Sequence, residues 1–429
     1  MVNVDIVLAI LFYGLLLLLF FAKRDRFTVQ GKIFIMYRTQ WGIALMDRLA
    51  RLFRPVIKVL GWLGIAVGFL GMGIILYTLL SSAVTLLLTP SAPPALAPVL
   101  PGIDIPGAPP LSFWHWVIVI LLVAVIHEFS HGVVARAYNI KVKSSGFAFL
   151  GPILAAFVEP DEHELKRRPV ATQLSVFAAG PFSNILTLFV VIFLFGLSIP
   201  SFQVFGVTLG IPHSLTARTA LLDVQTFIQD RYEIQGLQIQ QVEPGSAADE
   251  AGLQEGSVIT RLDRFEAQEN ATAFMEFLVY HLEPNMALEV ETLDRTYQVT
   301  TKPHPANQSR GQLGITFMPE IGPKKEYLAK VGEWRASFPM WFLLLLNWLL
   351  IISLGVGLFN LLPLGPVDGG RMFLAAALGI FAQESRARRV WGAVSLFVLL
   401  LLIINLLPWL TKLFLFLVQS FGLFLSLLL

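Results

Sequence analysis

The sequence contains no cysteine. This absence excludes disulfides, thiolate metal ligands and cysteine nucleophiles, so any bound metal must be held by histidine or carboxylate side chains. Charged residues are also scarce, at 14%, against 55% hydrophobic residues, and the net charge is only +2. Such a small charge argues against a nucleic-acid partner. The composition therefore lies outside the range of soluble globular proteins and indicates a multi-pass protein of the lipid bilayer.

Long apolar runs predict six or seven membrane-spanning helices, because about 20 apolar residues cross a bilayer as a helix. Basic residues follow the first run and crowd residues 27–58, which we predict to be a cytoplasmic loop. The predicted spans are 4–22, 59–88, 113–135, 170–199, 338–362 and 390–409, followed by an apolar run at 411–429 that either crosses or lies flat.

Two other segments differ from the spans in composition. Residues 89–112 are rich in proline and lack lysine and arginine, which indicates an extended external connector after two N-terminal helices in 1–112. Charged residues and alternating apolar residues return at 201–333, which indicates a soluble α+β domain outside the cytoplasm. This domain would separate two parts of a membrane core, 113–200 and 334–429.

The sequence GFAFLGPILAAFVEP, residues 146–160, is apolar but too short to span a bilayer. Gly151-Pro152 marks a turn in its middle. This pattern predicts a short hairpin embedded in the membrane. The alternative is a plain apolar loop packed beneath the helices.

The sequence HEFSH lies toward the cytoplasmic end of the third predicted span. His127 and His131 are four residues apart, so their imidazoles share one face of a helix and form half of a zinc site. Glu128 is about 100° further round the helix. From there it flanks the metal and can take a proton from a water molecule beside it.

A catalytic zinc ion needs a third protein ligand and one open position. Asp368 is the leading candidate, because it follows the fifth span on the cytoplasmic side. His115 lies about three turns from the motif and is too far away. His163 and Glu159 are nearer, but they belong to a loop or its edge, where solvation explains them.

The alternative is a structural polar cluster that joins helices by hydrogen bonds. HExxH sequences also occur by chance in soluble helices. Within a span, however, a charged group costs about 2.5–3.5 kcal/mol on insertion scales, so it is rarely present without a use.

These motifs resemble those of the site-2 proteases, a family of intramembrane zinc metalloproteases. HEFSH matches the HExxH of the family, and NLLPLGPVDGG at 360–370 is similar to its second motif, with Val367 in place of the usual leucine. AGPFSN at 179–184 resembles a third family element. The resemblance covers the third to fifth spans.

The resemblance implies one catalytic Zn²⁺ bound by His127, His131 and Asp368, with Glu128 as the general base. It also implies that Asn184 and Asn360 position the substrate or stabilise the oxyanion. For both asparagines the alternative is a hydrogen bond between helices.

Residues 242–259, VEPGSAADEAGLQEGSVI, resemble the PDZ domain that is common in this family. The local pattern agrees, with strands at 234–242 and 257–262 around a short helix and a closing strand near 311–317. Such a domain can bind a peptide end by adding a strand to a sheet edge. A filter that excludes bulky substrate ectodomains would have the same sequence.

The resemblance implies a protease of the cell membrane that cleaves transmembrane segments in regulated intramembrane proteolysis, after another protease has removed most of the substrate's external part. The active site would lie near the cytoplasmic side and the PDZ-like domain outside the cytoplasm. An exposed strand edge at 146–158 would pair with the unwound substrate. The alternatives are an inactive PDZ-bearing scaffold or chaperone that retains a metal site, and a metal transporter. A transporter is disfavoured because the ionisable residues gather at one level.

Overall fold

The computed structural model describes most of the chain and divides it into two compact units. The first unit contains Met1–Leu221 and Leu345–Leu429, and the second contains Leu222–Leu344. The residues outside the description are 1–3, 23–26, 31–33, 91, 93, 102–107, 151–152, 197–198, 205–206, 212–223, 306 and 429. The predicted turn at Gly151-Pro152 is among them.

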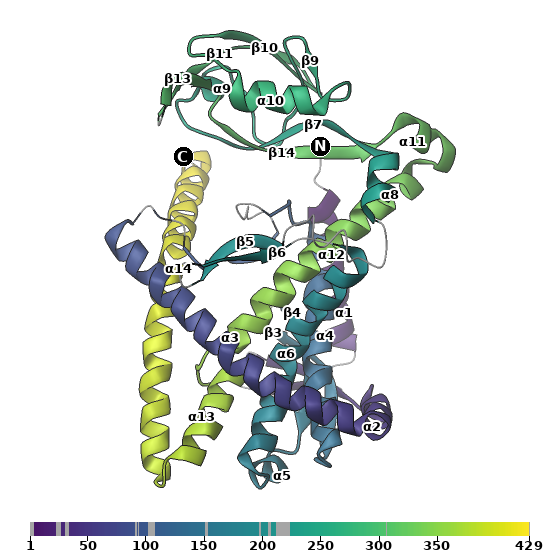
Figure 1. Cartoon of the computed structure of the whole chain (residues 1–429), viewed down its shortest axis with the longest axis vertical. Coiled ribbons are helices and arrows are strands. Elements are labelled where there is room, and N and C mark those ends of the chain that lie inside the picture. Colours follow the sequence, from purple (N-terminus) through teal and green to yellow (C-terminus); the bar gives the residue numbers. More distant parts are fainter. Residues whose placement is uncertain are drawn as a thin grey trace. The chain divides into compact units, whose positions relative to one another are not determined.

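Long apolar helices dominate the first unit, which confirms a multi-pass α-helical membrane protein (Figure 1). Five helices in the described residues are long and apolar enough to cross a membrane. A shorter apolar helix, α1, precedes them. The helices are α1 (Val4–Ala22), α3 (Arg54–Leu88), α4 (Phe113–Ala137), α6 (Val170–Phe195), α12 (Glu333–Asn360) and α14 (Glu384–Leu428).

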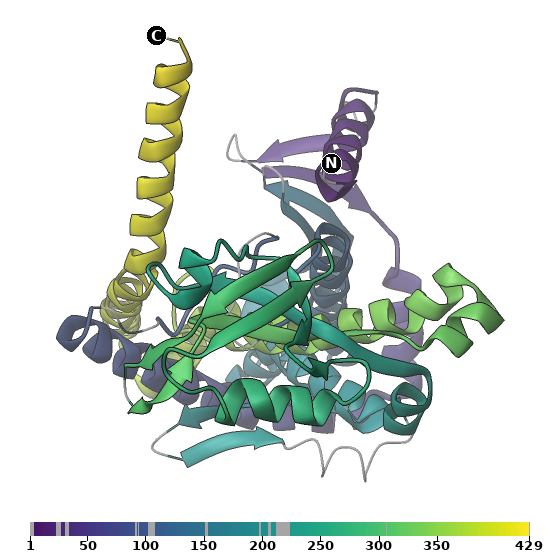
Figure 2. The same ribbon diagram turned by 90° about the horizontal axis from the view of Figure 1, so that it is seen from above.

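The predicted span at 390–409 and the apolar run at 411–429 lie, as far as residue 428, in one helix, α14, which has Pro408 inside it. Figure 2 shows its second half leaving the first half at an angle. Proline bends such a helix without ending it, since backbone groups in lipid must stay hydrogen-bonded and neighbouring groups satisfy the freed carbonyl.

Helix α3 carries a stripe of buried glycines that brings it close to the motif-bearing helices. A Cβ added at Gly64 would lie 3.4 Å from Phe182 of α6, and one added at Gly68 would lie 2.7 Å from Met372 of α13 (Asp368–Ile380). Small residues spaced in this way allow helices in membranes to approach closely. The N-terminal helix α3 therefore supports the helices that carry the second and third motifs.

The predicted hairpin exists, but it belongs to a four-stranded antiparallel sheet in the order β1-β2-β3-β4. The prediction of a loop at residues 27–58 is wrong, because these residues contain two of the strands, helix α2 (Ile43–Leu52) and the start of α3. The strands are β1 (Phe27–Gln30), β2 (Phe34–Thr39), β3 (Val142–Leu150) and β4 (Ile153–Pro160).

The pairing of β2 with β3 explains why residues 34–39 form a strand. Tyr37 lies opposite Phe147 and Arg38 opposite Gly146, where an added Cβ would lie 2.0 Å from the Tyr37 carbonyl oxygen. Glycine therefore permits the close approach of the two strands. Because β2 covers one edge of β3, the edge that stays free next to the motif helices belongs to β4.

The described part of the connector at 89–112 has neither helix nor strand. A two-stranded hairpin, β5 (Ile199–Val204) and β6 (Val207–Ile211), follows α6. The short helix α5 (Glu162–Lys166) follows β4, and the Asp161 side chain caps it by accepting the N–H groups of His163 and Glu164.

The second unit is a mixed α and β structure, as the strand and helix pattern of this region predicts. Its main sheet has the order β11-β10-β8-β7-β14, with β9 paired to β8. Buried side chains of the sheet and of α10 form the core. The elements are α8 (Val224–Arg231), β7 (Tyr232–Val242), α9 (Ala247–Glu250), β8 (Val258–Leu262), β9 (Phe265–Glu266), α10 (Ala271–Tyr280), β10 (Ala287–Thr292), β11 (Thr296–Thr300), β12 (Lys302–His304), β13 (Asn307–Gln312), β14 (Ile315–Pro323) and α11 (Lys325–Val331).

Candidate metal and catalytic site

The fold brings His127, His131 and Asp368 to one point. Both histidines lie on α4 and are buried, and Asp368 is the first residue of α13. The Nε2 atoms of His127 and His131 lie 3.0 and 3.2 Å from Asp368 Oδ2 and 3.3 Å from each other. Each residue can therefore offer one ligand atom to the same ion.

The separations of these atoms fit a tetrahedral zinc ion. Zinc bonds to imidazole and carboxylate are about 2.0–2.1 Å long, so neighbouring ligand atoms in a tetrahedron lie about 3.3 Å apart. Two nitrogens and one carboxylate oxygen also form a donor set of the kind that catalytic zinc uses.

The space for an ion beside the ligands depends on Gly180 of α6. A Cβ at this residue would lie 2.4 Å from His131 Nε2 and 2.5 Å from His127 Nε2. Any side chain would therefore crowd the two nitrogens that an ion must reach. Only glycine leaves this space open for an ion.

Helix α6 also orients the two imidazole rings. The Nδ1 atom of His131 lies 2.7 Å from the Val176 carbonyl oxygen, to which it can donate. The Nδ1 atom of His127 lies 3.1 Å from Asn184 Nδ2. With Nδ1 engaged in this way, each ring directs Nε2 toward Asp368, as outer hydrogen bonds do at metal sites.

Asn184 is fully buried, and its Oδ1 atom has no hydrogen-bond partner among the described residues. Its backbone carbonyl accepts a hydrogen bond from Ser353 of α12. The side chain thus lies behind His127. Asn360, the other predicted asparagine, lines the cavity beside the ligands and donates one N–H of its amide to the Val356 carbonyl at 3.1 Å.

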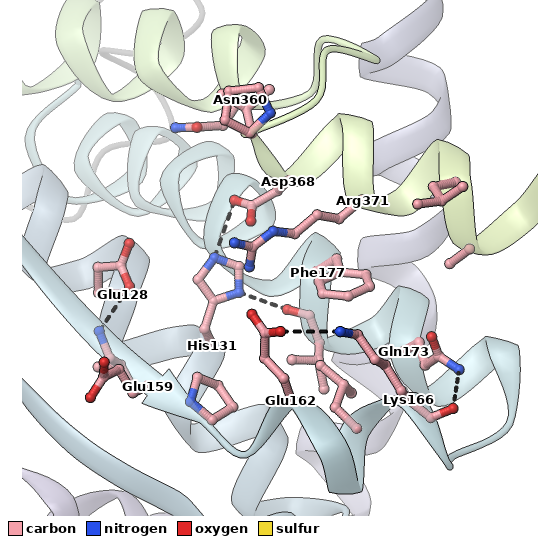
Figure 3. A pocket seen from close by; sticks show the side chains of 18 of the residues that line it. Glu128, His131, Glu159, Glu162, Lys166, Gln173, Phe177, Asn360, Asp368 and Arg371 are labelled. Carbon is pink, nitrogen blue, oxygen red and sulfur yellow. Dashed lines mark hydrogen bonds and ion pairs between the residues drawn. The ribbon is translucent and has the colours of Figure 1, made fainter. Parts of the chain in front are cut away.

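Glu128 lies between the ligands and the sheet. Its Oε2 atom accepts a hydrogen bond of 3.0 Å from the Val158 N–H of β4 (Figure 3). This N–H therefore points away from β3 and toward α4. The carboxylate and the free edge of β4 consequently meet at one place.

The three clustered ligand residues, Glu128 and Asn360 line one cavity of about 1100 Å³. Apolar side chains such as Phe177 and Leu374 form part of its wall, while charged side chains such as Lys143 and Arg388 also line it. A cavity of this size and mixed lining can admit both an extended peptide segment and water.

The sequence reasoning missed Arg371, which lines the cavity one turn beyond Asp368 (Figure 3). Its guanidinium carbon lies 6.0 Å from the centre of the Phe177 ring. The spacing of three residues from Asp368 on one helix would have revealed this placement.

The polar residues that the sequence excludes as ligands lie outside the ligand cluster. His115 is buried, with Nδ1 2.6 Å from the Ser112 hydroxyl. Glu159 forms an ion pair of 3.1 Å with Arg38. This hydrogen-bonded pairing lowers the pKa of the Glu159 carboxyl below its usual value.

Comparisons with known proteins agree with the motifs. The profile of peptidase family M50 matches residues 115–404. An uncharacterized protein of Methanocaldococcus jannaschii is 26% identical over 373 residues, which cover 86% of this chain and 85% of that protein. A probable chloroplastic membrane metalloprotease of Arabidopsis thaliana is 23% identical over 323 residues, which cover 68% of this chain and 66% of that protein.

The family match contains both histidines, Glu128, Asp368 and the two asparagines that the motifs single out. The match also covers more than half of the chain, so the predicted resemblance to the site-2 proteases is confirmed. The chain belongs to peptidase family M50, the site-2 protease family of membrane metalloproteases.

Proposed function

We propose that the chain is a zinc metalloendopeptidase that hydrolyses peptide bonds within transmembrane segments of membrane proteins, as in regulated intramembrane proteolysis. One observation carries the proposal: the three clustered ligand atoms, Glu128 and the free edge of β4 share a single cavity. The test is whether the purified chain cuts a bond inside the apolar segment of a reporter protein, and whether the cut depends on metal.

His127, His131 and Asp368 would hold the ion, which supplies a Lewis acid for the scissile carbonyl and activates water for attack. Glu128 takes the proton of the attacking water molecule at a carboxylate oxygen. As the C–N bond breaks, Glu128 passes this proton to the departing amine nitrogen. One fragment then ends in a carboxylate and the other begins with an amine. The second N–H of the Asn360 amide can donate to the negatively charged oxygen that forms from the scissile carbonyl during the attack.

The free edge of β4 supplies partners for the substrate backbone. A helix in lipid must unwind locally before its bond is cut, and the freed backbone groups then need new hydrogen bonds. Because the Val158 N–H points away from β3, the N–H of Ala156 points the same way by the two-residue period of a strand. An extended substrate segment that pairs here lies beside Glu128.

We expect Ala156→Pro to raise KM about fivefold without loss of metal, because it removes one outward N–H, worth about 1 kcal/mol, while edge strands tolerate proline. Steady-state cleavage of the reporter measures KM. Phe157→Pro is the matched control. The N–H of Phe157 lies between the two outward N–H groups and points toward β3, so its loss should lower the unfolding temperature of the protein. An unchanged KM in Ala156→Pro contradicts pairing at β4.

We also propose that Asn184 orients His127 rather than touching the substrate. A histidine that binds metal through Nε2 keeps its proton on Nδ1 and needs an acceptor there. The Asn184 Oδ1 atom, which has no described partner, provides this acceptor once the amide turns over.

Asn184→Leu should therefore weaken zinc binding by about 10–100-fold, while Asn184→Asp, which keeps an acceptor, should bind zinc at least as tightly as wild type. Competition with a chromogenic chelator measures both affinities without any need for activity. Equal losses in the two variants contradict this role.

The second unit would act as a PDZ-like module outside the cytoplasm. Strand β14 is at the edge of its sheet and, among the described strands, pairs with β7 alone, so it offers an edge to which a peptide end can add. The active site would lie near the cytoplasmic side of the cell membrane. Basic side chains on the cavity wall, including Lys143, Lys166 and Arg388, support this orientation.

A further inference from the structure

Helix α2 exposes apolar side chains on the face turned away from the bundle. Met46 and Ala50 are buried, whereas Trp41, Leu45 and Leu52 are 81%, 50% and 68% exposed. Leu45 and Leu52 are seven residues apart, so they lie on one face of the helix, and Trp41 lies just before the helix begins. We call these three residues the apolar strip.

Two arginines lie beside the apolar strip. Arg48 and Arg51 are both exposed, and neither forms an ion pair with any described residue. The acidic residue of the helix, Asp47, is paired instead with Arg136 of α4. An apolar strip next to a basic one is the pattern of a helix that lies in a membrane surface.

The place of α2 in the first unit agrees with this pattern. Figure 1 shows α2 nearly end-on, at the end of the bundle where α5 and the turn between α13 and α14 lie. Helices α4 and α6 run up the same picture, so α2 runs across their direction. A helix so oriented lies along a bilayer surface instead of crossing it.

Helix α2 is also fixed to the catalytic helix by three contacts along one face of α4. A Cβ at Gly132, next to His131, would lie 2.5 Å from Met46 Sδ. A Cβ at Gly42 would lie 3.7 Å from Phe129. The Asp47–Arg136 ion pair is the third contact.

We infer that α2 is an anionic-lipid-binding helix, with the apolar strip at the boundary of the acyl chains and Arg48 and Arg51 on lipid phosphates. Anionic headgroups are the partner because two exposed guanidinium groups lack protein counter-charges. The lipid surface then fixes the position of α2, and the contacts of α2 with α4 fix the part of α4 that carries the two histidines.

The absence of cysteine makes a depth measurement direct, because one introduced cysteine carries the only label. Full-length chains with Leu45→Cys or Leu52→Cys, each bearing a nitroxide, are reconstituted into phosphatidylcholine vesicles with and without phosphatidylglycerol. Accessibility to oxygen and to a water-soluble nickel chelate gives the depth of each label. Leu396→Cys on α14 is the lipid reference and Glu269→Cys in the second unit is the aqueous reference, since both positions are exposed.

Labels at 45 and 52 should be shielded from nickel and lie shallower than the label at 396. Phosphatidylglycerol should draw them deeper, and Arg48→Gln/Arg51→Gln should remove this response. Arg386→Gln/Arg389→Gln, at two exposed positions near the start of α14, is the matched control and should leave it unchanged. The inference is overturned if the labels are as open to nickel as the label at 269, or if the double variant responds to phosphatidylglycerol as wild type does. The readout requires no cleavage, so it stands independently of the proposed function.

Discussion

Gly180→Ala is expected to abolish zinc binding and, with it, all cleavage. The added methyl carbon would lie 2.4 and 2.5 Å from the two Nε2 atoms that face Asp368. It would therefore crowd the atoms that an ion must reach at bond lengths of about 2.0–2.1 Å. Helices packed to the density of a protein interior cannot move apart to restore the space. We expect the affinity to fall by at least about 100-fold, the upper end of the loss from one outer-shell partner.

Zinc binding by Gly180→Ala is measured with a competing chelator, alongside thermal unfolding in the same detergent. Gly355→Ala is the matched control, because it also adds a methyl group to a long apolar helix, but nothing lies within 4 Å of the new carbon. It should bind zinc as wild type does. Zinc bound by Gly180→Ala with wild-type affinity contradicts the placement of the ion between the two histidines.

Glu128→Gln is expected to lower kcat by at least about 100-fold, the contribution of a general base, and to leave zinc bound. Glutamine has the same shape, and its carbonyl oxygen can still accept the hydrogen bond from the Val158 N–H. It cannot take a proton from water. The loss should therefore appear in kcat, with little change in KM.

Glu162→Gln serves as the control for this variant. Glu162 lines the same cavity, but it is exposed and pairs with Lys166 four residues along α5. An exposed pair of this kind contributes little, so Glu162→Gln should cleave at the wild-type rate. Equal losses in the two variants indicate a general effect of charge in the cavity and contradict a base at Glu128.

The sequence predicted those features of the site that depend on local spacing. His127, Glu128 and His131 lie within five residues, so the geometry of a helix alone places two imidazoles together and the carboxylate beside them. Asp368 is 241 residues from His127. It was found from membrane topology and by elimination, because few ionisable residues occur near the spans.

Other features that depend on distant contacts were missed or predicted wrongly. Strand β2 pairs with β3 across more than 100 residues, and its basic neighbours made its segment resemble a loop. The free space at Gly180 exists only because α6 packs against α4 at that turn. The partner of Asn184 could not be predicted either, because it depends on the rotation of α6 about its axis.

The most direct test of intramembrane cleavage is to identify the bond that the purified chain cuts. A reporter transmembrane segment is incubated in detergent under three conditions: wild-type protein with zinc, Glu128→Gln protein with zinc, and wild-type protein with a chelator. The masses of the fragments are measured by mass spectrometry. We predict two fragments whose masses sum to the reporter plus one water, from a cut inside the apolar segment, with wild type and zinc alone. An intact reporter, or a cut that Glu128→Gln makes equally well while both proteins hold zinc, would contradict the proposed function.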